Sequence, residues 1–266
     1  MKKKKVDIEG DVEIQVFKAS EVLDLERKKP RLLSGCKSID SLIKGFETGC
    51  ITEVFGEYGT GKTQLALQLS VWVQKPLSEG GLEGKALYID TEGAYSASRV
   101  AEISKARGMD PQKVLGNIFY IKVSSVRELF AAVNKAELLV KEENIKLIVI
   151  DSLMHLFRIE FQGRAMLAER QQKLNKLLSK LRKIAEEHDV VVLVTNHVIE
   201  KPQFSFLERE KAAGGHVLAH SPKLRLMIRK SFGNKRILRI VDSPYLPPAE
   251  IPFQITKAGL EDVSPS

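Results

Sequence analysis

A glycine-rich octet at residues 56–63 carries the residue types that hold a nucleoside triphosphate. It reads Gly-x-x-x-x-Gly-Lys-Thr, and the backbone N–H groups of such a loop cradle phosphate oxygens. Lys62 is expected to reach the β- and γ-phosphates, and the hydroxyl of Thr63 to hold Mg²⁺. The predicted nucleotide-binding residues of this segment are Gly56, Glu57, Tyr58, Gly59, Thr60, Gly61, Lys62, Thr63 and Gln64. An apolar run at 51–55 and a helical pattern at 64–73 flank the octet as the motif requires, so the chain is predicted to bind ATP.

Two further runs end in acids that suit the chemistry of ATP. The apolar run 146–151 ends in Asp151, and an Asp at the end of a buried strand beside a phosphate loop can bind Mg²⁺. The run 88–92 ends in Glu92, and a carboxylate at a strand tip can orient and deprotonate the attacking water. Glu92 and Lys62 are therefore the predicted catalytic residues, with a helix-entry or solvated acid as the alternative role of Glu92.

Composition narrows the class of protein. The chain has 266 residues, a net charge of +8 and a pI near 9.3. No apolar run reaches the roughly 20 residues that span a bilayer, and no signal peptide follows the basic start, so a soluble, cytoplasmic protein is expected. The positive charge favours a polyanionic partner, although Lys/Glu-rich proteins of hyperthermophiles share it. Cys36 and Cys50 lack metal-ligand spacing and are expected to be small, semi-buried residues.

Alternating helical and apolar segments must position these residues. Expected strands lie at 86–90, 118–123, 146–151 and 190–195, and expected helices at 98–107, 126–142 and 167–188. Apolar strands between helices predict an α/β fold with a mostly parallel central sheet flanked by helices. Later strands at 223–230, 235–242 and 252–256 are expected to be antiparallel additions. We divide the chain into an arm at 1–32, with a strand-like piece at 13–17, and an ATPase domain at 33–266.

Several longer motifs resemble those of the RadA/RecA recombinases, and of the archaeal RadA branch in particular. They are Gly-Glu-Tyr-Gly-Thr-Gly-Lys-Thr-Gln at 56–64, Ile-Asp-Thr-Glu at 89–92, Ile-Asp-Ser-Leu at 150–153, Leu-Ala-Glu-Arg-Gln-Gln-Lys-Leu at 167–174, Val-Thr-Asn at 194–196 and Gly-Gly-His-Val-Leu-Ala-His-Ser at 214–221. They stand in the order and at the spacing of that family. The resemblance implies a RecA-like P-loop ATPase core that binds DNA between the subunits of a filament.

The resemblance also implies roles for single residues. Glu92 falls where the family activates water, Asp151 where it has its metal-binding acid, and Arg99 where it stacks an arginine on adenine. The implied DNA contacts are Arg158, Arg164 and Arg170 in a first loop, and Lys201, Arg209, Lys211, Gly214 and Gly215 in and after a second loop. Arginines spaced in this way can grip phosphates, and the alternative is a solvated basic turn. Aromatic and basic residues of the second loop can stack on a single strand or pack against a neighbouring subunit.

The chain departs from the family in several places. Residues 1–32 are too few for the family's N-terminal helix-hairpin-helix domain, which this sequence is therefore expected to lack. His197 stands where the family has a glutamine that senses the γ-phosphate, and a neutral imidazole can still bond a phosphate oxygen. The second loop ends at 208–213 without a proline, whereas the family has prolines there that cap ATP of the neighbouring subunit. Phe17 and Ser20 stand in the place of the family's polymerisation motif, and Phe17 either enters another subunit or packs on its own domain.

These observations predict a RadA paralogue, a DNA-stimulated, Mg²⁺-dependent ATPase that assists homologous recombination and DNA repair. Its expected partners are single-stranded DNA, with double-stranded DNA as a further candidate, and a second copy or a RadA recombinase bound through the arm. The alternatives are an autonomous strand-exchange recombinase, a non-hydrolysing ATP-binding adaptor of RadA, and a RecA-like ATPase without a role on DNA.

Overall fold

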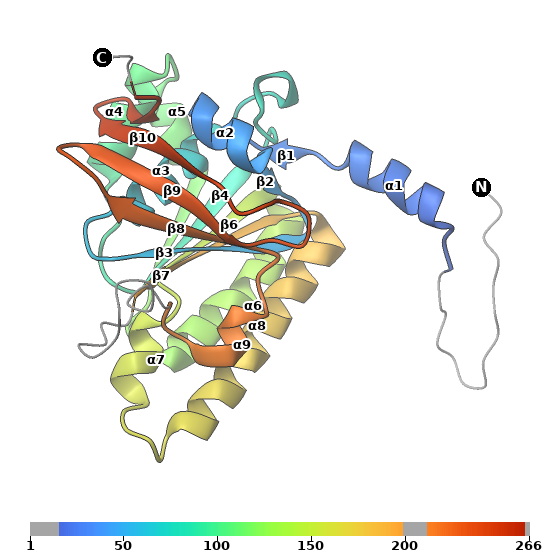
Figure 1. Ribbon diagram of the computed structural model, residues 1–266, viewed down its shortest axis with the longest axis vertical. Coiled ribbons are helices and arrows are strands. Elements are labelled where there is room, and N and C mark those ends of the chain that lie inside the picture. Colours follow the sequence, from blue (N-terminus) through green and yellow to red (C-terminus); the bar gives the residue numbers. More distant parts are fainter. Residues whose placement is uncertain (1–15, 199–211, 264–266) are drawn as a thin grey trace. The chain divides into compact units, whose positions relative to one another are not determined.

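The computed structural model describes residues 16–198 and 212–263 (Figure 1). The chain divides into two compact units, Met1–Pro30 and Arg31–Ser266. In the first unit the described residues form one helix, α1 (Ala19–Lys28), which has no buried side chain. Of the strand-like piece expected at 13–17, only Val16 and Phe17 are described, and they are not in a strand.

Helix α1 was missed because the arm lacks a sustained apolar period, yet local signals for it are present. The carboxylate of Glu21 accepts a hydrogen bond from the backbone N–H of Lys18 at 2.9 Å, as in a capping box. Arg27 and Lys28 occupy the last turn, where cations interact favourably with the helix dipole. The helix therefore depends on its ends rather than on a buried face.

The second unit alternates helices and strands in the order that the sequence predicted, with additional short elements. Its helices are α2 (Lys37–Ile43), α3 (Lys62–Trp72), a 3-10 turn at Leu77–Glu79, α4 (Ala97–Ala106), α5 (Pro111–Gly116), α6 (Val126–Glu142), α7 (His155–Glu160), α8 (Leu167–His188) and α9 (Gly215–Ala219). Its strands are β1 (Arg31–Leu32), β2 (Phe46–Glu47), β3 (Cys50–Gly56), β4 (Lys85–Asp90), β5 (Ile118–Lys122), β6 (Ile145–Asp151), β7 (Val191–His197), β8 (Leu224–Lys230), β9 (Lys235–Asp242), β10 (Glu250–Thr256) and β11 (Gly259–Glu261). None of the described helices has both the length and the apolar character that crossing a bilayer requires.

Among the described residues, nine strands form one sheet in the order β11-β10-β9-β8-β3-β7-β6-β4-β5. In this order β8, β3, β7, β6, β4 and β5 pair with one another in parallel. Strands β9, β10 and β11 extend the sheet beyond β8 by antiparallel pairing. The expected mostly parallel sheet with antiparallel C-terminal strands is thus confirmed. The expectation for 223–230 was wrong in one respect, because β8 runs parallel to β3 and is antiparallel only to β9. The long connection from β7 through α9 acts as a crossover, which allows this parallel pairing.

Alternate residues of the central strands supply two separate cores, one on each face of the sheet. Leu147 and Val149 pack with α2, α3 and α4, whereas Ile148 and Ile150 pack with α6 and α8. Figure 1 shows α6 and α8 lying together on one side of the sheet. This period-2 alternation in an all-apolar strand is typical of a parallel sheet covered on both faces. Cys36 belongs to the first core, and neither it nor the half-buried Cys50 is part of a disulfide.

The strand order brings the candidate site residues to one edge of the sheet. Gly56 at the end of β3 is in register with His197 at the end of β7, and Asp90 of β4 is in register with Asp151 of β6. Because parallel strands point their carboxyl ends the same way, these ends form a continuous edge. Ligands of open α/β sheets bind in the crevice at such an edge.

A buried ion pair lies beneath this edge. Glu53 of β3 is fully buried, and its carboxylate accepts hydrogen bonds from Arg225 Nε of β8 at 2.6 Å and from Asn196 Nδ2 of β7 at 2.8 Å. Burial raises the pKa of Glu53, while the charge of Arg225 and the two hydrogen bonds counteract that rise. The pair fastens β8 and β7 to β3.

We expect Arg225→Ala to lower the free energy of unfolding by about 3–5 kcal/mol, because it leaves the Glu53 carboxylate buried without its partner. The matched control is Arg229→Ala on the same strand. It removes a pair with Glu250 whose side chains are 41% and 46% exposed, and should cost less than about 1 kcal/mol. Urea denaturation of both variants measures the difference, and equal losses would contradict this account of the buried pair.

Candidate active site

The phosphate loop joins the end of β3 to the start of α3 in a conformation that depends on glycine. Gly59 and Gly61 have φ angles of 72° and 108°, in the left-handed region that side chains disfavour. A Cβ at Gly61 would also lie 2.6 Å from Ile255 Cδ1 of β10. The first helical residue is Lys62, so the positive end of the α3 dipole faces the loop. The loop can therefore approach an anion with its backbone.

The side chain of Lys62 lies inside the loop and is buried. Its ammonium donates to the carbonyl oxygens of Gly56 at 2.9 Å and Glu57 at 2.8 Å. Burial lowers the pKa of Lys62, and the charges of Asp151 and Glu92 oppose that shift. Phosphate oxygens are stronger, charge-assisted acceptors than peptide carbonyls, so the ammonium is placed to exchange these partners for a triphosphate.

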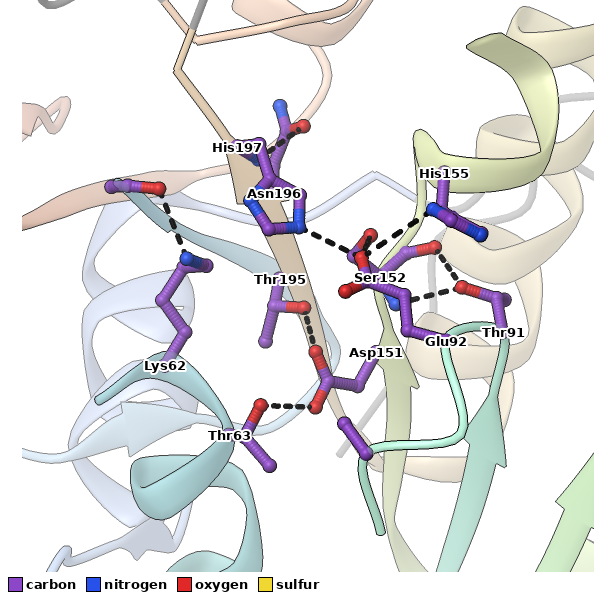
Figure 2. A network of polar contacts seen from close by, with 12 residues as sticks. Lys62, Thr63, Thr91, Glu92, Asp151, Ser152, His155, Thr195, Asn196 and His197 are labelled. Atoms are coloured by element: carbon purple, nitrogen blue, oxygen red, sulfur yellow. Dashed lines mark hydrogen bonds and ion pairs between the residues drawn. The ribbon is translucent and has the colours of Figure 1, made fainter. Parts of the chain in front are cut away.

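The buried carboxylate of Asp151 collects hydroxyl donors from three other elements, and Figure 2 shows Thr63 and Thr195 among them. Thr63 Oγ1 and Tyr88 Oη donate to its Oδ2 at 2.8 and 2.7 Å, and Thr195 donates to its Oδ1. The donors come from α3, β4 and β7. Burial and the negative charge of Asp151 raise the pKa of Tyr88 well above its usual value, so the phenol keeps the proton that it donates.

This donor set fits Mg²⁺ as phosphoryl-transfer enzymes hold it. Mg²⁺ prefers oxygen ligands, keeps several waters, and is usually bound by one or two carboxylates together with substrate phosphates. The neighbouring Thr63 hydroxyl and Asp151 carboxylate supply such oxygens beside the phosphate loop. The described residues hold no cluster of three or more His, Cys, Asp or Glu side chains suited to a metal site made by protein alone.

Glu92 is a second carboxylate at this edge, and side chains from the end of β7, the turn after β6 and the start of α7 surround it (Figure 2). Its Oε1 accepts a hydrogen bond from Ser152 Oγ and lies 2.7 Å from His197 Nε2 and 4.0 Å from His155 Nδ1. Burial raises the pKa of Glu92, but the hydrogen bonds from His197 and Ser152 and the charges of both histidines outweigh it, and the pKa falls to about 2. The carboxylate is therefore ionised at neutral pH, as a general base requires.

Asp90 fixes the loop that carries Glu92. This fully buried carboxylate accepts backbone N–H bonds from Glu92, Gly93, Ala94 and Tyr95, at 2.8 to 3.2 Å, and the hydroxyl of Tyr120 at 3.1 Å. Satisfying so many donors with one carboxylate leaves the loop few other conformations. The position of Glu92 is thus set by the strand end that precedes it.

Two cavities meet at Glu92 and His197. The first, of about 270 Å³, is lined by Tyr58, Gly59, Gly61, Lys62, Thr63, Gln64, Glu92, Ala94, Asp151, His197 and Ile255. The second, of about 450 Å³, is lined by Glu92, His155, Arg158, Ile159, Gln162 and His197. Most of the residues predicted to bind the nucleotide line the first cavity, whereas Gly56, Glu57, Thr60 and Arg99 do not, and the predicted DNA contact Arg158 lines the second cavity. Glu92 and His197 form a wall common to both.

Arg99, on which the adenine was expected to stack, does not line either cavity. Its guanidinium donates to Gln64 Oε1 at 2.8 Å and to the carbonyl oxygens of Thr256 and Lys257, and it pairs with Glu102. Gln64 does line the first cavity. Arg99 is thus held beside the predicted nucleotide site by α3 and the end of β10, and stacking on adenine stays a prediction.

The predicted DNA contacts lie in different settings. Arg158 is on the short helix α7 rather than in a loop, Arg164 follows that helix, and Arg170 is in the first turns of α8. Helix α7 forms because the segment after Asp151 buries Leu156 and Phe157 in the core on the α8 side. Lys201, Arg209 and Lys211 lie outside the described residues.

Gly214 and Gly215 lie directly after that segment. Their φ angles are 118° and 65°, and a Cβ at Gly214 would lie 2.8 Å from the side chain of Leu218. Gln171 of α8 donates to the carbonyl oxygen of Gly214 at 3.0 Å. The glycines therefore allow a tight turn at this position. Their contact with DNA remains a prediction.

In the arm, Phe17 precedes α1 and its side chain is 43% exposed, and Ser20 is in the first turn of α1. The polymerisation role of these two residues also remains a prediction.

Sequence reasoning gave no role to residues that the structure places in the site. Tyr88, Ser152 and Thr195 stood inside recognised motifs, but their contacts with Asp151 and Glu92 depend on strand pairing. His155 carried no motif signal at all, and it reaches Glu92 because α7 follows β6 directly. For Thr195 one signal was available in the sequence, because it is a polar residue near the end of a buried apolar strand.

The comparisons with known proteins agree with this geometry. A family model described as Rad51 matches residues 27–263. A protein of Aeropyrum pernix named "DNA repair and recombination protein RadA" is 44% identical over 248 residues, which cover 92% of this chain and 78% of that protein. A protein of Ignicoccus hospitalis with the same name is 46% identical over 253 residues, or 92% of this chain and 77% of that protein.

We expect Asp90→Asn to loosen the loop of Glu92, because an amide keeps one acceptor oxygen and leaves buried donors unpaired. Each donor left without a partner costs about 1–3 kcal/mol of folding free energy. Urea denaturation measures the loss. Asp110→Asn is the matched control, since asparagine caps the exposed N-terminus of α5 as well as aspartate does. A loss for Asp90→Asn no larger than the control's would contradict the role of Asp90.

Proposed function

The chain belongs to the Rad51 family, whose members are RecA-type ATPases, and from that premise we propose a DNA-stimulated, Mg²⁺-dependent ATPase that assists homologous recombination and DNA repair. The observation that carries the proposal is the assembly of Lys62, Thr63, Asp151 and Glu92 around one cavity. The two relatives named RadA support the recombination and repair role. A protein that assists recombination and repair of chromosomal DNA would act at the nucleoid.

The residues of the first cavity divide the work of ATP hydrolysis. Lys62 donates to the β- and γ-phosphate oxygens and offsets the charge that develops on them. Thr63 and Asp151 hold Mg²⁺, which when bound neutralises phosphate charge. Glu92 orients the attacking water and accepts its proton. Arg99 and Gln64 support the loop side of the nucleotide.

DNA would lie against the other side of the wall formed by Glu92 and His197. Arg158 lines the second cavity, and Arg164 and Arg170 continue the basic segment toward α8. Gly214, Gly215 and the basic residues of 199–211 supply the second proposed contact, mainly with single-stranded DNA and also with double-stranded DNA. The common wall gives a physical route by which DNA can alter turnover. Phe17 and Ser20 would join the chain to a second copy or to a RadA recombinase.

One observation favours a second candidate function, that of a non-hydrolysing adaptor that binds ATP to stabilise a RadA complex. Oε1 of the Glu92 carboxylate is already bonded to Ser152 and His197, so a water can be held only through Oε2. An adaptor binds ATP tightly and shows negligible turnover with or without DNA.

Two substitutions separate binding from hydrolysis in the first cavity. We expect Lys62→Ala to lose ATP binding and turnover, and Glu92→Gln to keep ATP binding while turnover falls about 10²- to 10⁴-fold. Titration with a fluorescent ATP analogue and release of phosphate with and without single-stranded DNA measure the two quantities. The control is Glu79→Gln, which changes an exposed acid after α3. Its ATP binding and turnover should match those of the wild type. Unchanged turnover in Glu92→Gln would remove Glu92 from the mechanism.

The first DNA contact is tested by salt dependence. Each lost phosphate contact to a single strand lowers the slope of log affinity against log salt by about 0.7, so Arg158→Ala with Arg164→Ala should lower it by about 1.4. Fluorescence anisotropy of a labelled oligonucleotide gives both slopes. The control is Lys105→Ala with Lys113→Ala, which removes the same amount of positive charge. These lysines lie on α4 and α5, which precede the amino end of β5, so the slope should stay unchanged. Equal slopes for the wild type and the arginine variant would rule out these contacts.

A further inference from the structure

The end of strand β8 continues past the end of β3 and lies beside the phosphate loop. The two strands are parallel, with Phe55 in register with Met227, and β3 ends at Gly56 while β8 continues to Lys230. The backbones come close here, since a Cβ at Gly56 would lie 2.1 Å from the carbonyl oxygen of Ile228. The last side chains of β8 are therefore placed next to the loop that follows β3.

Lys230 is the side chain of β8 that faces this loop. Alternate residues of a strand share a face, and Lys230 is on the face of Leu226 and Ile228, which belong to the core beside α3. Its Nζ lies 3.5 Å, and its Cε 3.6 Å, from the position that a Cβ would occupy on Gly59. Because Gly59 has no side chain, the ammonium lies directly against the loop. Gly59 also lines the first cavity, so the ammonium is at the rim of that cavity.

The other two basic side chains of β8 have carboxylate partners. Arg225 Nε lies 2.6 Å from Glu53 Oε2, and an Nη atom of Arg229 lies 3.1 Å from Glu250 Oε1. The exposed ammonium of Lys230 makes no ion pair or side-chain hydrogen bond with any residue that the structure describes. It is therefore available for an anion that comes from outside the chain.

The charge of Lys230 adds to the positive potential inside the loop. Burial lowers the pKa of Lys62, nearby carboxylates oppose that shift, and the positive charge of Lys230 acts in the same direction as burial. Two ammonium groups that face one loop repel each other, and an anion bound between or beside them removes the repulsion. The pair of lysines therefore favours a ligand with more than one negative charge.

We propose that Lys230 is a second phosphate-binding cation of the nucleotide site, which contacts the phosphates of ATP from the end of β8. A lysine is suited to this contact, because its ammonium binds phosphate as a point charge on a flexible stem. The side chain is exposed and can turn from Gly59 toward a bound triphosphate without breaking an ion pair. The inference rests on the proposed ATP site and gives Lys230 a role in binding, not in proton transfer.

The first test compares the affinity of two charge-removing variants of the full chain for Mg²⁺-ATP by isothermal titration calorimetry. Lys230→Gln should weaken binding about tenfold, because one charge-assisted contact with phosphate is lost. Arg229→Gln is the matched control. It removes the same charge from the neighbouring residue, which lies on the other face of β8, and should weaken binding less than about twofold because exposed charges are screened.

Unchanged affinity in Lys230→Gln would overturn the proposal. Equal losses in Lys230→Gln and Arg229→Gln would also overturn it, because they would assign the effect to net charge. Lys230→Arg keeps the positive charge and should retain the affinity of the wild type within about threefold. Wild-type protein that binds no ATP would instead contradict the proposed function on which the inference rests.

A second readout needs no substitution. Acetylation of the free protein with N-acetoxysuccinimide should modify the exposed Lys230, and peptide mass spectrometry measures the rate. Saturating Mg²⁺-ATP should lower that rate about fivefold, since an ammonium bonded to phosphate keeps its proton and does not attack the reagent. Lys113, exposed on α5, is the control and should react equally with and without ATP. Equal labelling of Lys230 in protein that binds ATP would overturn the proposal.

Discussion

A carboxylate taken out of water stays charged only where hydrogen-bond donors surround it, and the burial of Asp151 imposes that condition on the whole sheet edge. Its donors are the hydroxyls of Thr63, Tyr88 and Thr195, which come from three different elements. They can meet only if β7 and β4 lie on either side of β6 and if α3 starts beside them. The strand order, the phosphate loop and the metal-binding acid are therefore one arrangement rather than three separate features.

The same edge carries both the nucleotide site and the proposed DNA contact, and the two have the side chains of Glu92 and His197 in common. Glu92 and His197 belong to neighbouring cavities, one lined by the phosphate loop and one by Arg158 of α7. Asp90 fixes the Glu92 loop from below, and the buried pair of Glu53 and Arg225 fastens the strands beside it. The backbone that carries the wall is thus held in place by buried charges.

Prediction from the sequence succeeded where a signal was local and continuous. The helix expected at 167–188 and the strand expected at 235–242 have those bounds in the structure. It failed where tertiary contacts decided. Helix α7 forms because Leu156 and Phe157 are buried by neighbouring elements, and the direction of β8 depends on a crossover. Helix α1 was missed because its stabilising signals lie at its ends and not in a repeating apolar pattern.

By itself the sequence determined the nucleotide chemistry, because the glycines, Lys62 and Thr63 of the phosphate loop act within eight consecutive residues and need only the adjoining strand and helix. It also indicated Asp151 and Glu92 as strand-end acids. Only the tertiary structure decided what those acids contact. Glu92 and His197 are 105 residues apart in the chain, and their 2.7 Å separation results from the order and register of β4, β6 and β7. Hydrogen bonds act over about 3 Å, so a contact of this kind exists only once the sheet has formed.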